Sequence, residues 1–473
     1  MIWNGWGGSP RGVRVEGLRP IPRAEVELGH LTLITGENNR GKSWLASLIW
    51  GLHQAPYSLW TEIVPATREA LITLAQQIWA EGPVIERADY EAMSLRALRG
   101  GTEDLLAEDD PRWLAWRDLC AAAAVDMHAA LLTRVFRAPI GAQVTLTGPQ
   151  VAPFGLVRAT DGMVGILNRG SGGGGVHQID HDYTDRALVE PLVQELCLAS
   201  VGFNLRVSVG RGPIDALAGA LYLPAARTGL VQALPILAEN LIGEALGDRR
   251  APALPSLPAP TVQLLRLLVN PGQTADWNTD LVTILEERLL RGRVHRAAAG
   301  IQYEYQPAGT TLRVPMGRSS AVVTELLPLV LTLQRVIPPS FLVYEEPEAH
   351  LHPELQRQLA RVLVRMARRG TRLLITTHSD VFVQEINNCV KVGALRARGD
   401  AEASLGPGEE EAWLAPDEVR AYEFGGDAEG QTEVRRLEVL EEGVVAPMFN
   451  RSIADQMQAL IDLDERLNRA RST

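Results

Sequence analysis

Two short segments that lie far apart in the chain constrain its fold more than any other feature. Gly36–Ser43 (Gly-Glu-Asn-Asn-Arg-Gly-Lys-Ser) fits G-x-x-x-x-G-K-[ST], the pattern of a phosphate-binding loop, and Phe341–Pro347 (Phe-Leu-Val-Tyr-Glu-Glu-Pro) is an apolar run that ends in two carboxylates. A triphosphate site uses both, because the loop holds the phosphates while carboxylates hold a metal and activate water. The sequence therefore predicts one site built from two distant parts of the chain.

The context of each segment is that of an α/β sheet. Leu31–Thr35 is rich in β-forming residues and leads into the loop, and Trp44–Leu52 has the pattern of a helix, which is the setting that the motif requires. Phe341–Tyr344 and Arg372–Thr377 are short apolar runs with a helical pattern between them, Leu355–Arg368. Because alternating strands and helices build parallel sheets, the predicted fold class is α/β, a parallel or mixed sheet with flanking helices.

The side chains of the loop and of the strand ends have distinct expected roles. Lys42 is predicted to reach the β- and γ-phosphates and Ser43 to bind Mg²⁺ through its hydroxyl. Glu345 is best placed to hold Mg²⁺, which leaves Glu346 to orient or deprotonate the attacking water. His378 follows the second strand and is placed to contact the γ-phosphate. The ordinary alternatives are a chance loop match, a charged strand end and a structural histidine.

The composition of the 473-residue chain is that of an ordinary globular protein, 46% hydrophobic and 22% charged, and no apolar run approaches the roughly 18 residues of a membrane span. The formal net charge of −11 disfavours nucleic acid over the surface as a whole, so a DNA contact requires a local basic face. Cys120, Cys197 and Cys389 lack metal-ligand spacing and are predicted to be buried thiols. The N-terminus lacks a signal-peptide pattern, so a cytoplasmic location is expected.

Three motifs taken together resemble the ATP-binding cassette (ABC) ATPases of the SMC, RecF and OLD (overcoming lysogeny defect) type. They are the phosphate loop, Glu345–Pro353 (Glu-Glu-Pro-Glu-Ala-His-Leu-His-Pro) and Thr376–Asp380 (Thr-Thr-His-Ser-Asp). The resemblance implies a split ABC-ATPase head interrupted by an inserted helical and mixed α+β region. It assigns the phosphate loop to Walker A, the two carboxylates to Walker B and His378 to the switch histidine. The family often has Asp at the position of Glu345, and Glu preserves the charge.

The resemblance also assigns residues to a dimer interface. Glu348–Pro353 matches the D-loop, and Gly317–Ala321 lies where the family has its signature motif, although it lacks the Ser-Gly-Gly of transporters. Ser319 and Ser320 are therefore the candidates to contact the γ-phosphate of a partner. The predicted nucleotide-binding residues are thus Gly36, Asn38, Asn39, Arg40, Gly41, Lys42, Ser43, Trp44, Ser319 and Ser320.

Changes of pattern along the chain divide it into six expected parts. The head is predicted to comprise residues 1–58, with Walker A, and 301–395, with the signature, Walker B, the D-loop and the switch histidine. Between them lie a helical insertion (59–138), a mixed β/α lobe (139–235) and a helical region (236–300), and an extension follows (396–473). OLD-type nucleases carry a Toprim domain after the head. Asp462 and Asp464 lie in a helical pattern instead, so no Toprim domain and no intrinsic nuclease activity are expected.

Two features leave alternatives open. Arginines at helical spacing within Arg357–Arg369, and a second group within Arg288–Arg296, either contact a phosphate backbone or belong to solvated faces paired with acids. Arg227 lies in Tyr222–Gly229, a segment that resembles prokaryotic relatives of this group. Its side chain either faces nucleotide or the lobe interface, or forms a structural salt bridge.

The resemblance implies an ATPase that binds ATP and Mg²⁺ and works as a homodimer, or a higher homo-oligomer, through its heads. ATP would lie between Walker A and the opposing signature segment, and hydrolysis would separate the heads. The bound nucleotide would therefore determine the conformation of the dimer. The resemblance favours prokaryotic DNA maintenance or anti-phage defence, and the expected role is anti-phage defence in which the ATPase controls a separate effector protein, with no membrane partner. Two alternatives stay open: a RecF- or SMC-like DNA-binding ATPase in DNA repair, and an ATP-binding scaffold without a catalytic role.

Overall fold

The computed structural model describes residues 12–53, 60–81, 84–85, 109–136, 143–147, 154–159, 163–168, 176–178, 190, 193–194, 197, 220–234, 257–272, 274, 278–297, 302–336, 338–427, 429–446 and 457–463. Residue contacts divide the chain into two compact units. The sheet unit comprises residues 19–22, 28–46 and 221–473, and the insertion unit comprises residues 1–18, 23–27 and 47–220.

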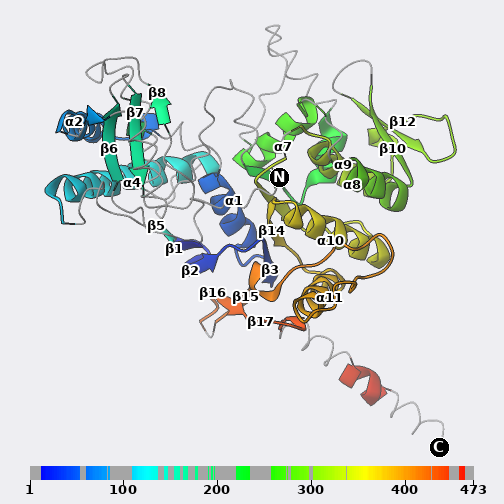
Figure 1. Ribbon diagram of the computed structural model, residues 1–473. Helices are drawn as coiled ribbons and strands as arrows, with labels where there is room; N and C mark the ends of the chain where they lie inside the picture. The colour runs from blue at the N-terminus through cyan, green and yellow to red at the C-terminus, as the bar shows by residue number, and fades with distance from the viewer. Residues whose placement is uncertain are drawn as a thin grey trace, which may run out of the picture. The chain divides into compact units, whose positions relative to one another are not determined.

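A six-stranded sheet with the order β16-β15-β3-β14-β13-β9 lies at the centre of the sheet unit (Figure 1). Its strands are β3 (Leu31–Gly36), β9 (Ala220–Leu223), β13 (Phe341–Glu345), β14 (Arg372–Thr376), β15 (Val419–Gly426) and β16 (Thr432–Leu437). β13, β14, β3 and β15 are parallel to one another, and β16 is antiparallel to β15. The mostly parallel sheet confirms the α/β prediction, and its strands come from both ends of the chain.

β3 and β13 are central strands, and every one of their residues is buried. Such continuous apolar runs are typical of parallel strands that are covered on both faces. β14 lies between them, and its register pairs Thr376 with Glu345 on one side and with Ile34 on the other. The carboxyl ends of the three strands therefore reach the same edge of the sheet, the edge where ligands of open α/β sheets bind.

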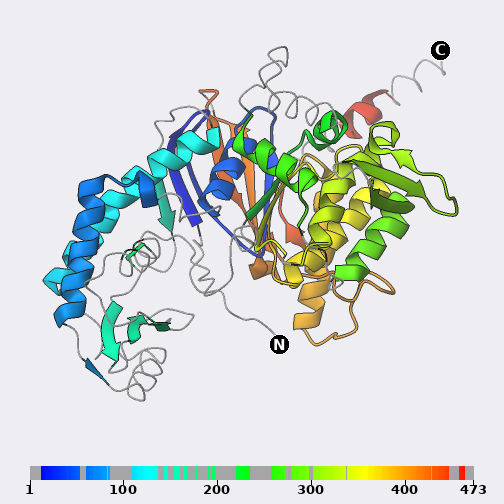
Figure 2. The ribbon, with the colours of Figure 1, turned by 90° about the horizontal axis from the view of Figure 1, so that it is seen from above.

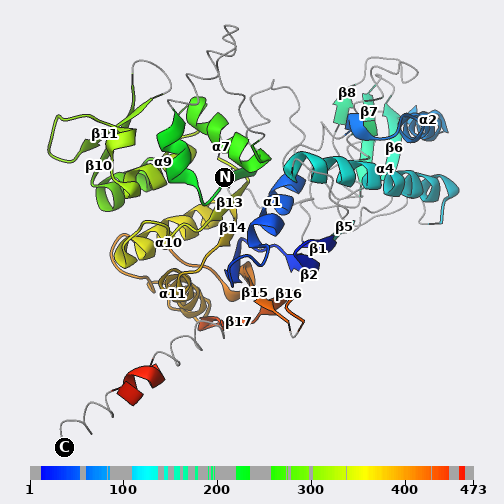
Figure 3. The ribbon, with the colours of Figure 1, turned by 180° about the vertical axis from the view of Figure 1, so that it is seen from behind.

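The principal helices of the sheet unit are α9 (Ala321–Leu333), α10 (Pro353–Arg368) and α11 (Asp380–Ala397), and α1 (Lys42–His53) begins in it. α10 and α11 lie side by side in Figures 1 and 3 and contact each other. Each begins at a side-chain cap, because His352 Nδ1 accepts from the N–H of Glu354 and Ser379 Oγ accepts from the N–H of Phe382. Caps of this kind satisfy N–H groups that lack partners inside a helix.

Smaller elements complete the sheet unit. They are α7 (Ala259–Val269), α8 (Thr279–Ile284), the π-helix η4 (Leu285–Leu290), the 3₁₀ helices η5 (Met316–Arg318) and η6 (Pro416–Glu418), and strands β10 (Gly292–Arg296), β11 (Tyr303–Pro307), β12 (Val314–Pro315), β17 (Val439–Leu440) and β18 (Gly443–Val444). β10, β11 and β12 form an antiparallel sheet. α9 packs against α7, α8 and η4, and all its residues from Val323 to Leu333 are buried.

The described residues of the insertion unit form two small sheets and two long helices. One sheet has the order β2-β1-β5 and the other β4-β6-β7-β8. The elements are β1 (Gly12–Leu18), β2 (Ile21–Glu27, whose first two residues belong to the sheet unit), β4 (Val84–Ile85), β5 (Gln143–Thr147), β6 (Phe154–Ala159), β7 (Met163–Asn168), β8 (Val176–Gln178), α2 (Pro65–Glu81) and α4 (Pro111–Phe136). In Figure 2, α2 and α4 are the blue and cyan helices that run side by side.

α4 is long and apolar enough to cross a membrane by length and composition alone, which the sequence expectation did not foresee. The buried core helix of a globular protein passes the same test. Trp116, Cys120 and Met127 of α4 are buried within the unit. Cys197 and Cys389 are buried too, so the prediction of three buried thiols is confirmed.

The largest difference from the sequence expectations lies near the C-terminus. Residues 396–473, expected to form an extension beyond the head, supply β15 and β16 to the central sheet. β15 pairs with β3 along six residues, Val419–Phe424, so this strand borders the phosphate loop. Of the C-terminal helical pattern, the structure describes residues 457–463, and these are helical.

Candidate nucleotide-binding site

The phosphate loop runs from the end of β3 to the start of α1. Gly36 has a φ of +127° and Gly41 a φ of +88°, backbone conformations that residues with a side chain rarely adopt. Asn39, between them, has a φ of 62°. Because α1 begins at Lys42, the N–H groups of its first turn, which have no partners within a helix, border the loop. This strand, loop and helix arrangement is the one that binds phosphate in proteins with this motif.

Lys42 is buried beneath the loop, with 7% of its surface exposed. Its Nζ donates hydrogen bonds to the carbonyl oxygens of Gly36 (3.0 Å) and Glu37 (2.5 Å). Burial lowers the pKa of Lys42 to about 8, and the nearby carboxylates, Glu346 foremost, oppose that shift. Phosphate oxygens would offer this poorly solvated ammonium group a stronger partner than neutral carbonyls.

The other loop residues differ in their surroundings. Arg40 Nε donates to Glu37 Oε2 (2.7 Å), and Arg40 Nη1 donates to the carbonyl oxygen of Gly430 (2.9 Å) in the turn between β15 and β16. The loop is therefore fastened to the strand pair that the sequence did not predict. Among the predicted nucleotide ligands of the loop and the start of α1, the exposed residues are Asn38, Asn39, Ser43 and Trp44.

Glu345 ends β13 and is 5% exposed. Its Oε2 accepts a hydrogen bond from the N–H of Ala225 (3.2 Å), whereas its buried Oε1 accepts none from the residues that the structure describes. A buried carboxylate oxygen without a donor is costly unless a cation or a ligand binds it. Oxygen ligands are what Mg²⁺ prefers, and Ser43 offers an exposed hydroxyl at the start of α1, so these residues fit that ion.

Glu346 and His378 lie together at the ends of neighbouring strands. His378 Nε2 is 3.7 Å from Glu346 Oε1, and both side chains are partly exposed. Burial, and next the charge of Lys42, lower the pKa of His378, while Glu346 opposes that shift. The structure thus brings the predicted base and the predicted switch histidine into one place, and the lowered pKa favours the neutral form of His378.

Glu348, in the predicted D-loop, holds the backbone of His378, the predicted switch histidine. Its Oε1 accepts a hydrogen bond from the N–H of His378 (2.7 Å). Burial raises the pKa of Glu348, and this hydrogen bond opposes the shift. A contact between the expected dimer-interface segment and the expected γ-phosphate sensor was not part of the sequence prediction.

Ser319 and Ser320 lie directly before α9. Ser319 Oγ donates to the carbonyl oxygen of Pro315 (3.3 Å). Ser320 is the residue at the N-terminal cap of α9, yet its side chain makes no capping hydrogen bond. Of the two serines, Ser319 therefore uses its hydroxyl in a local hydrogen bond, whereas the Ser320 hydroxyl does not cap α9.

Arg227 is fully buried and forms a salt bridge with Glu325 of α9, which is also fully buried. Of the alternatives that the sequence left open, this contact matches the structural salt bridge. Glu325 itself was not singled out from the sequence, although it is the only charged residue in α9. A lone carboxylate in an apolar helix is a usable signal, because buried charges are almost always paired.

The arginine clusters are also engaged within the protein. In the first cluster, Arg357 and Arg361 pair with Glu385, Arg365 with Glu409, Arg368 with Glu418, and Arg369 with Asp280 and Glu411. In the second, Arg288 pairs with Glu409 and Arg293 lies 3.8 Å from Glu286. These pairs support the reading of faces paired with acids and weaken that of DNA contacts.

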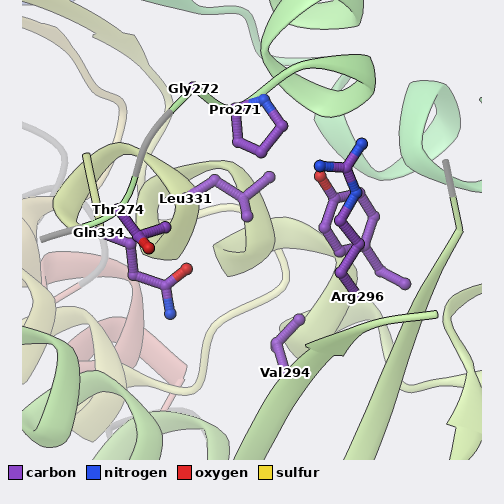
Figure 4. Close-up of a pocket in the computed structure, with 8 residues that line it drawn as sticks. Pro271, Gly272, Thr274, Val294, Arg296, Leu331 and Gln334 are labelled. Carbon is purple, nitrogen blue, oxygen red and sulfur yellow. The ribbon is translucent and has the colours of Figure 1, made fainter. Parts of the chain in front are cut away.

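A cavity of about 590 Å³ lies elsewhere in the sheet unit (Figure 4). Arg296 and Tyr303 line it, and both side chains already donate to backbone carbonyls near the end of α7, those of Val269 and Leu268. No residue of the predicted nucleotide site contributes to the cavity, whose lining comprises Pro271, Gly272, Thr274, Val294, Arg296, Tyr303, Leu331 and Gln334.

A protein-family model described as "AAA domain, putative AbiEii toxin, Type IV TA system" matches residues 323–384, a range that includes Glu345, Glu346 and His378. No curated protein matches the sequence. Together, the family match, the mostly parallel sheet and the site geometry support a nucleotide-binding ATPase domain.

Three solved structures are similar to this chain at low identity. The SMC head bound to the C-winged helix domain of ScpA has 11% identity and a TM-score of 0.36, with 91% of this chain and 98% of that chain covered. The SMC head domain from Thermotoga maritima has 11% identity and a TM-score of 0.33, with 91% and 100% covered. The Smc head domain from Pyrococcus furiosus, with an extended coiled coil and bound to the C-terminal domain of ScpA, has 10% identity and a TM-score of 0.34, with 95% and 99% covered.

Proposed function

We propose that this chain binds and hydrolyses ATP and works as a nucleotide-driven switch. One observation carries the proposal: at a single edge of the sheet, buried Lys42 lies under a phosphate loop, near a carboxylate oxygen of Glu345 that accepts no hydrogen bond from the described part of the chain. Glu346 and His378 lie at the same edge, 3.7 Å apart. The family match over residues 323–384 adds support, since it covers the carboxylates and the histidine.

The residues at this edge suit hydrolysis of the terminal phosphoanhydride. Lys42 would exchange its loop carbonyls for phosphate oxygens, and Ser43 and Glu345 would hold Mg²⁺, which neutralises phosphate charge when bound. Glu346 would accept a proton from the attacking water as the water oxygen bonds to the γ-phosphorus and the bond to the β-phosphate oxygen breaks. His378, neutral because burial lowers its pKa, would exchange hydrogen bonds with the γ-phosphate and respond to its release.

The switch would be a dimer of heads with nucleotide between them. Ser320 supports this arrangement, because its hydroxyl stands at the start of α9 without capping it. Glu348 adds a link from the D-loop to His378. A partner head that contacts the D-loop would thereby influence the side chain expected to sense the γ-phosphate.

A role in anti-phage defence, through a separate effector protein, fits this switch better than DNA repair. The matching family's description names a putative toxin of a type IV toxin–antitoxin system. A clamp on DNA is disfavoured, because the net charge is −11 and the arginines of α10 already pair with internal acids. The proposed location of the switch is the cytoplasm.

Replacing Glu346 by Gln tests the proposal. The variant should bind ATP with unchanged affinity, hydrolyse it at least about 100-fold more slowly, and remain dimeric with ATP and Mg²⁺ when measured by light scattering. The matched control is Glu354→Gln, at an exposed carboxylate near the start of α10, which should hydrolyse ATP normally. Unchanged hydrolysis by Glu346→Gln would remove the catalytic part of the proposal, and absence of ATP binding by the parent protein would remove all of it.

A further inference from the structure

The buried guanidinium group of Arg227 forms hydrogen bonds to three segments of the sheet unit. Its Nη1 donates to the carbonyl oxygens of Pro224 (2.7 Å) and Glu345 (2.5 Å), and its Nη2 donates to the carbonyl oxygen of Glu346 (3.0 Å). Nη2 also donates to a carboxylate oxygen of Glu325. One guanidinium therefore links the turn after β9, the end of β13 and helix α9. A planar fork of fixed donors suits this task, whereas the single ammonium of lysine does not.

The contacts with β13 fall where the expected catalytic carboxylates leave the strand. Glu346 has a φ of 42°, in the left-handed region that residues with a side chain avoid. Such a conformation persists only when neighbouring groups hold it, and three contacts act here: the N–H of Glu346 donates to the carbonyl oxygen of Thr376, and the carbonyl oxygen of Glu346 accepts from Arg227 and from the N–H of Ala349. Arg227 thus helps to set the direction of the Glu346 side chain.

The same segment also holds the carboxylate of Glu345. The N–H of Ala225, two residues before Arg227, donates to Glu345 Oε2, and no donor among the described residues reaches Oε1. Because Arg227 donates to the backbone of both Glu345 and Pro224, it fixes the distance between this N–H and the carboxylate. The orientation of the predicted Mg²⁺ ligand therefore depends on Arg227.

Glu325 extends these contacts to the signature segment. It lies in the second turn of α9, which begins directly after Ser320, and its Oε2 accepts from the Thr228 hydroxyl (2.7 Å). Both oxygens of this buried carboxylate are therefore used by Arg227 and Thr228, the first residues of the helical segment 227–234. A movement of α9 would therefore be transmitted through the Arg227–Glu325 ion pair to the carbonyl groups of Glu345 and Glu346.

A direct contact between Arg227 and nucleotide does not fit the structure. The side chain has no exposed surface, its two terminal nitrogens are occupied, and its guanidinium stacks over the ring of Tyr344, 4.6 Å from the ring centroid. Stability alone is a weak reason for such a pair, because well-packed apolar residues often replace buried ion pairs without loss.

We infer that Arg227 is a positioning residue for ATP hydrolysis. Through its ion pair with Glu325, Arg227 couples the signature helix α9 to the Walker B carboxylates Glu345 and Glu346. The inference rests on the proposed function. The position of the signature helix in one head would determine the orientation of the two carboxylates in the same head. Contact between that helix and a partner's nucleotide would thereby adjust hydrolysis in the same chain.

The experiment compares Arg227→Lys with Arg361→Lys. Arg361 is the matched control, because it is partly buried and pairs with buried Glu385 of α11 at 2.5 Å, and its ion pairs within the described residues involve no residue of the site. Arg227→Lys should lower kcat about 10- to 100-fold, raise the Mg²⁺ concentration needed for half-maximal rate, and leave the ATP affinity measured without Mg²⁺ unchanged. Arg361→Lys should lower the unfolding temperature with kcat unchanged.

Glu325→Gln supplies a second, independent test if Arg227→Lys folds poorly. This substitution removes the charge and keeps the shape of the side chain, so it should lower kcat, as Arg227→Lys does. The double variant, with both substitutions, should be no slower than the slower single variant. Folded Arg227→Lys and Glu325→Gln proteins with normal kcat and normal Mg²⁺ dependence would overturn the inference, as would an equal fall of kcat in Arg361→Lys. Lack of hydrolysis by the parent protein would instead count against the proposed function.

Discussion

Replacing Gly36 by alanine tests whether β15 is part of the nucleotide site. Gly36 is the last residue of β3, and its register partner on β15 is Phe424. A Cβ at Gly36 would lie 2.1 Å from the carbonyl oxygen and 2.6 Å from the nitrogen of Phe424. These are backbone atoms of a paired strand, so neither can rotate away.

The expected loss of stability follows from three contributions. An alanine at a φ of +127° costs about 1–3 kcal/mol, because this conformation suits glycine alone. The clash with the strand adds about 1–3 kcal/mol of overpacking. Displacement of Phe424 also breaks the hydrogen bond from the N–H of Glu37 to its carbonyl oxygen (2.9 Å), which is worth about 1 kcal/mol. The sum, about 3–7 kcal/mol, is a large share of the stability of a typical domain.

Urea unfolding followed by circular dichroism, with and without a fluorescent ATP analogue, measures both effects. Gly425→Ala is the matched control on the same strand, because a Cβ there meets nothing within 4 Å, and it should change stability by less than about 1 kcal/mol. Gly36→Ala should shift the midpoint to much lower urea and abolish nucleotide binding. Equal midpoints for the two variants would refute the predicted clash. Loss of binding at full stability would show that Gly36 serves the phosphates alone.

Two further predictions concern the arginines of α10. Burial raises the pKa of Glu385, but hydrogen bonds from Arg361 and Arg357 outweigh it and hold the pKa below its usual 4.5. The pair therefore stabilises the fold above about pH 4.5 and its contribution is lost as the pH falls further, so Glu385→Gln should flatten the pH dependence of the urea midpoint below about pH 5. Arg368 stacks 3.7 Å from the ring centroid of Trp413, so Arg368→Ala should cost about 1 kcal/mol in stability. It should leave DNA affinity, measured by fluorescence anisotropy at low salt, unchanged; a weaker affinity with a shallower salt slope would revive the DNA-binding alternative.

The sequence predicted the parts of the fold whose signal is local. β3, the loop and α1 follow one another without interruption, and the runs that form β13 and β14 are short, apolar and fully buried apart from Arg372. β15 escaped prediction because it pairs with β3 across nearly the whole chain. Its partner cannot be read from Val419–Gly426, and a polar, Gly-rich stretch precedes it.

The same distinction holds for the site. Lys42, Glu345, Glu346 and His378 stand in local motifs, and parallel strands bring the ends of those motifs together by geometry. Arg227 and Glu325 have no shared motif, and only the packing of α9 shows that they meet. Their separate signals are an arginine in a mostly apolar segment and a lone carboxylate in an apolar helix. Each indicates that a partner exists without showing which residue it is.

The arginines of α10 are paired with acids, so a partner's binding surface should be sought elsewhere on the protein. Within the described residues, their partners come from α11, from the loop before β15 and from the start of α8, so the cationic face of this helix holds neighbouring segments in place. Charge used in this way is unavailable to a phosphate backbone. A partner that responds to nucleotide is better placed against groups that nucleotide would move. Under the proposed function, those groups are the predicted D-loop at Glu348 and the start of α9 at Ser320.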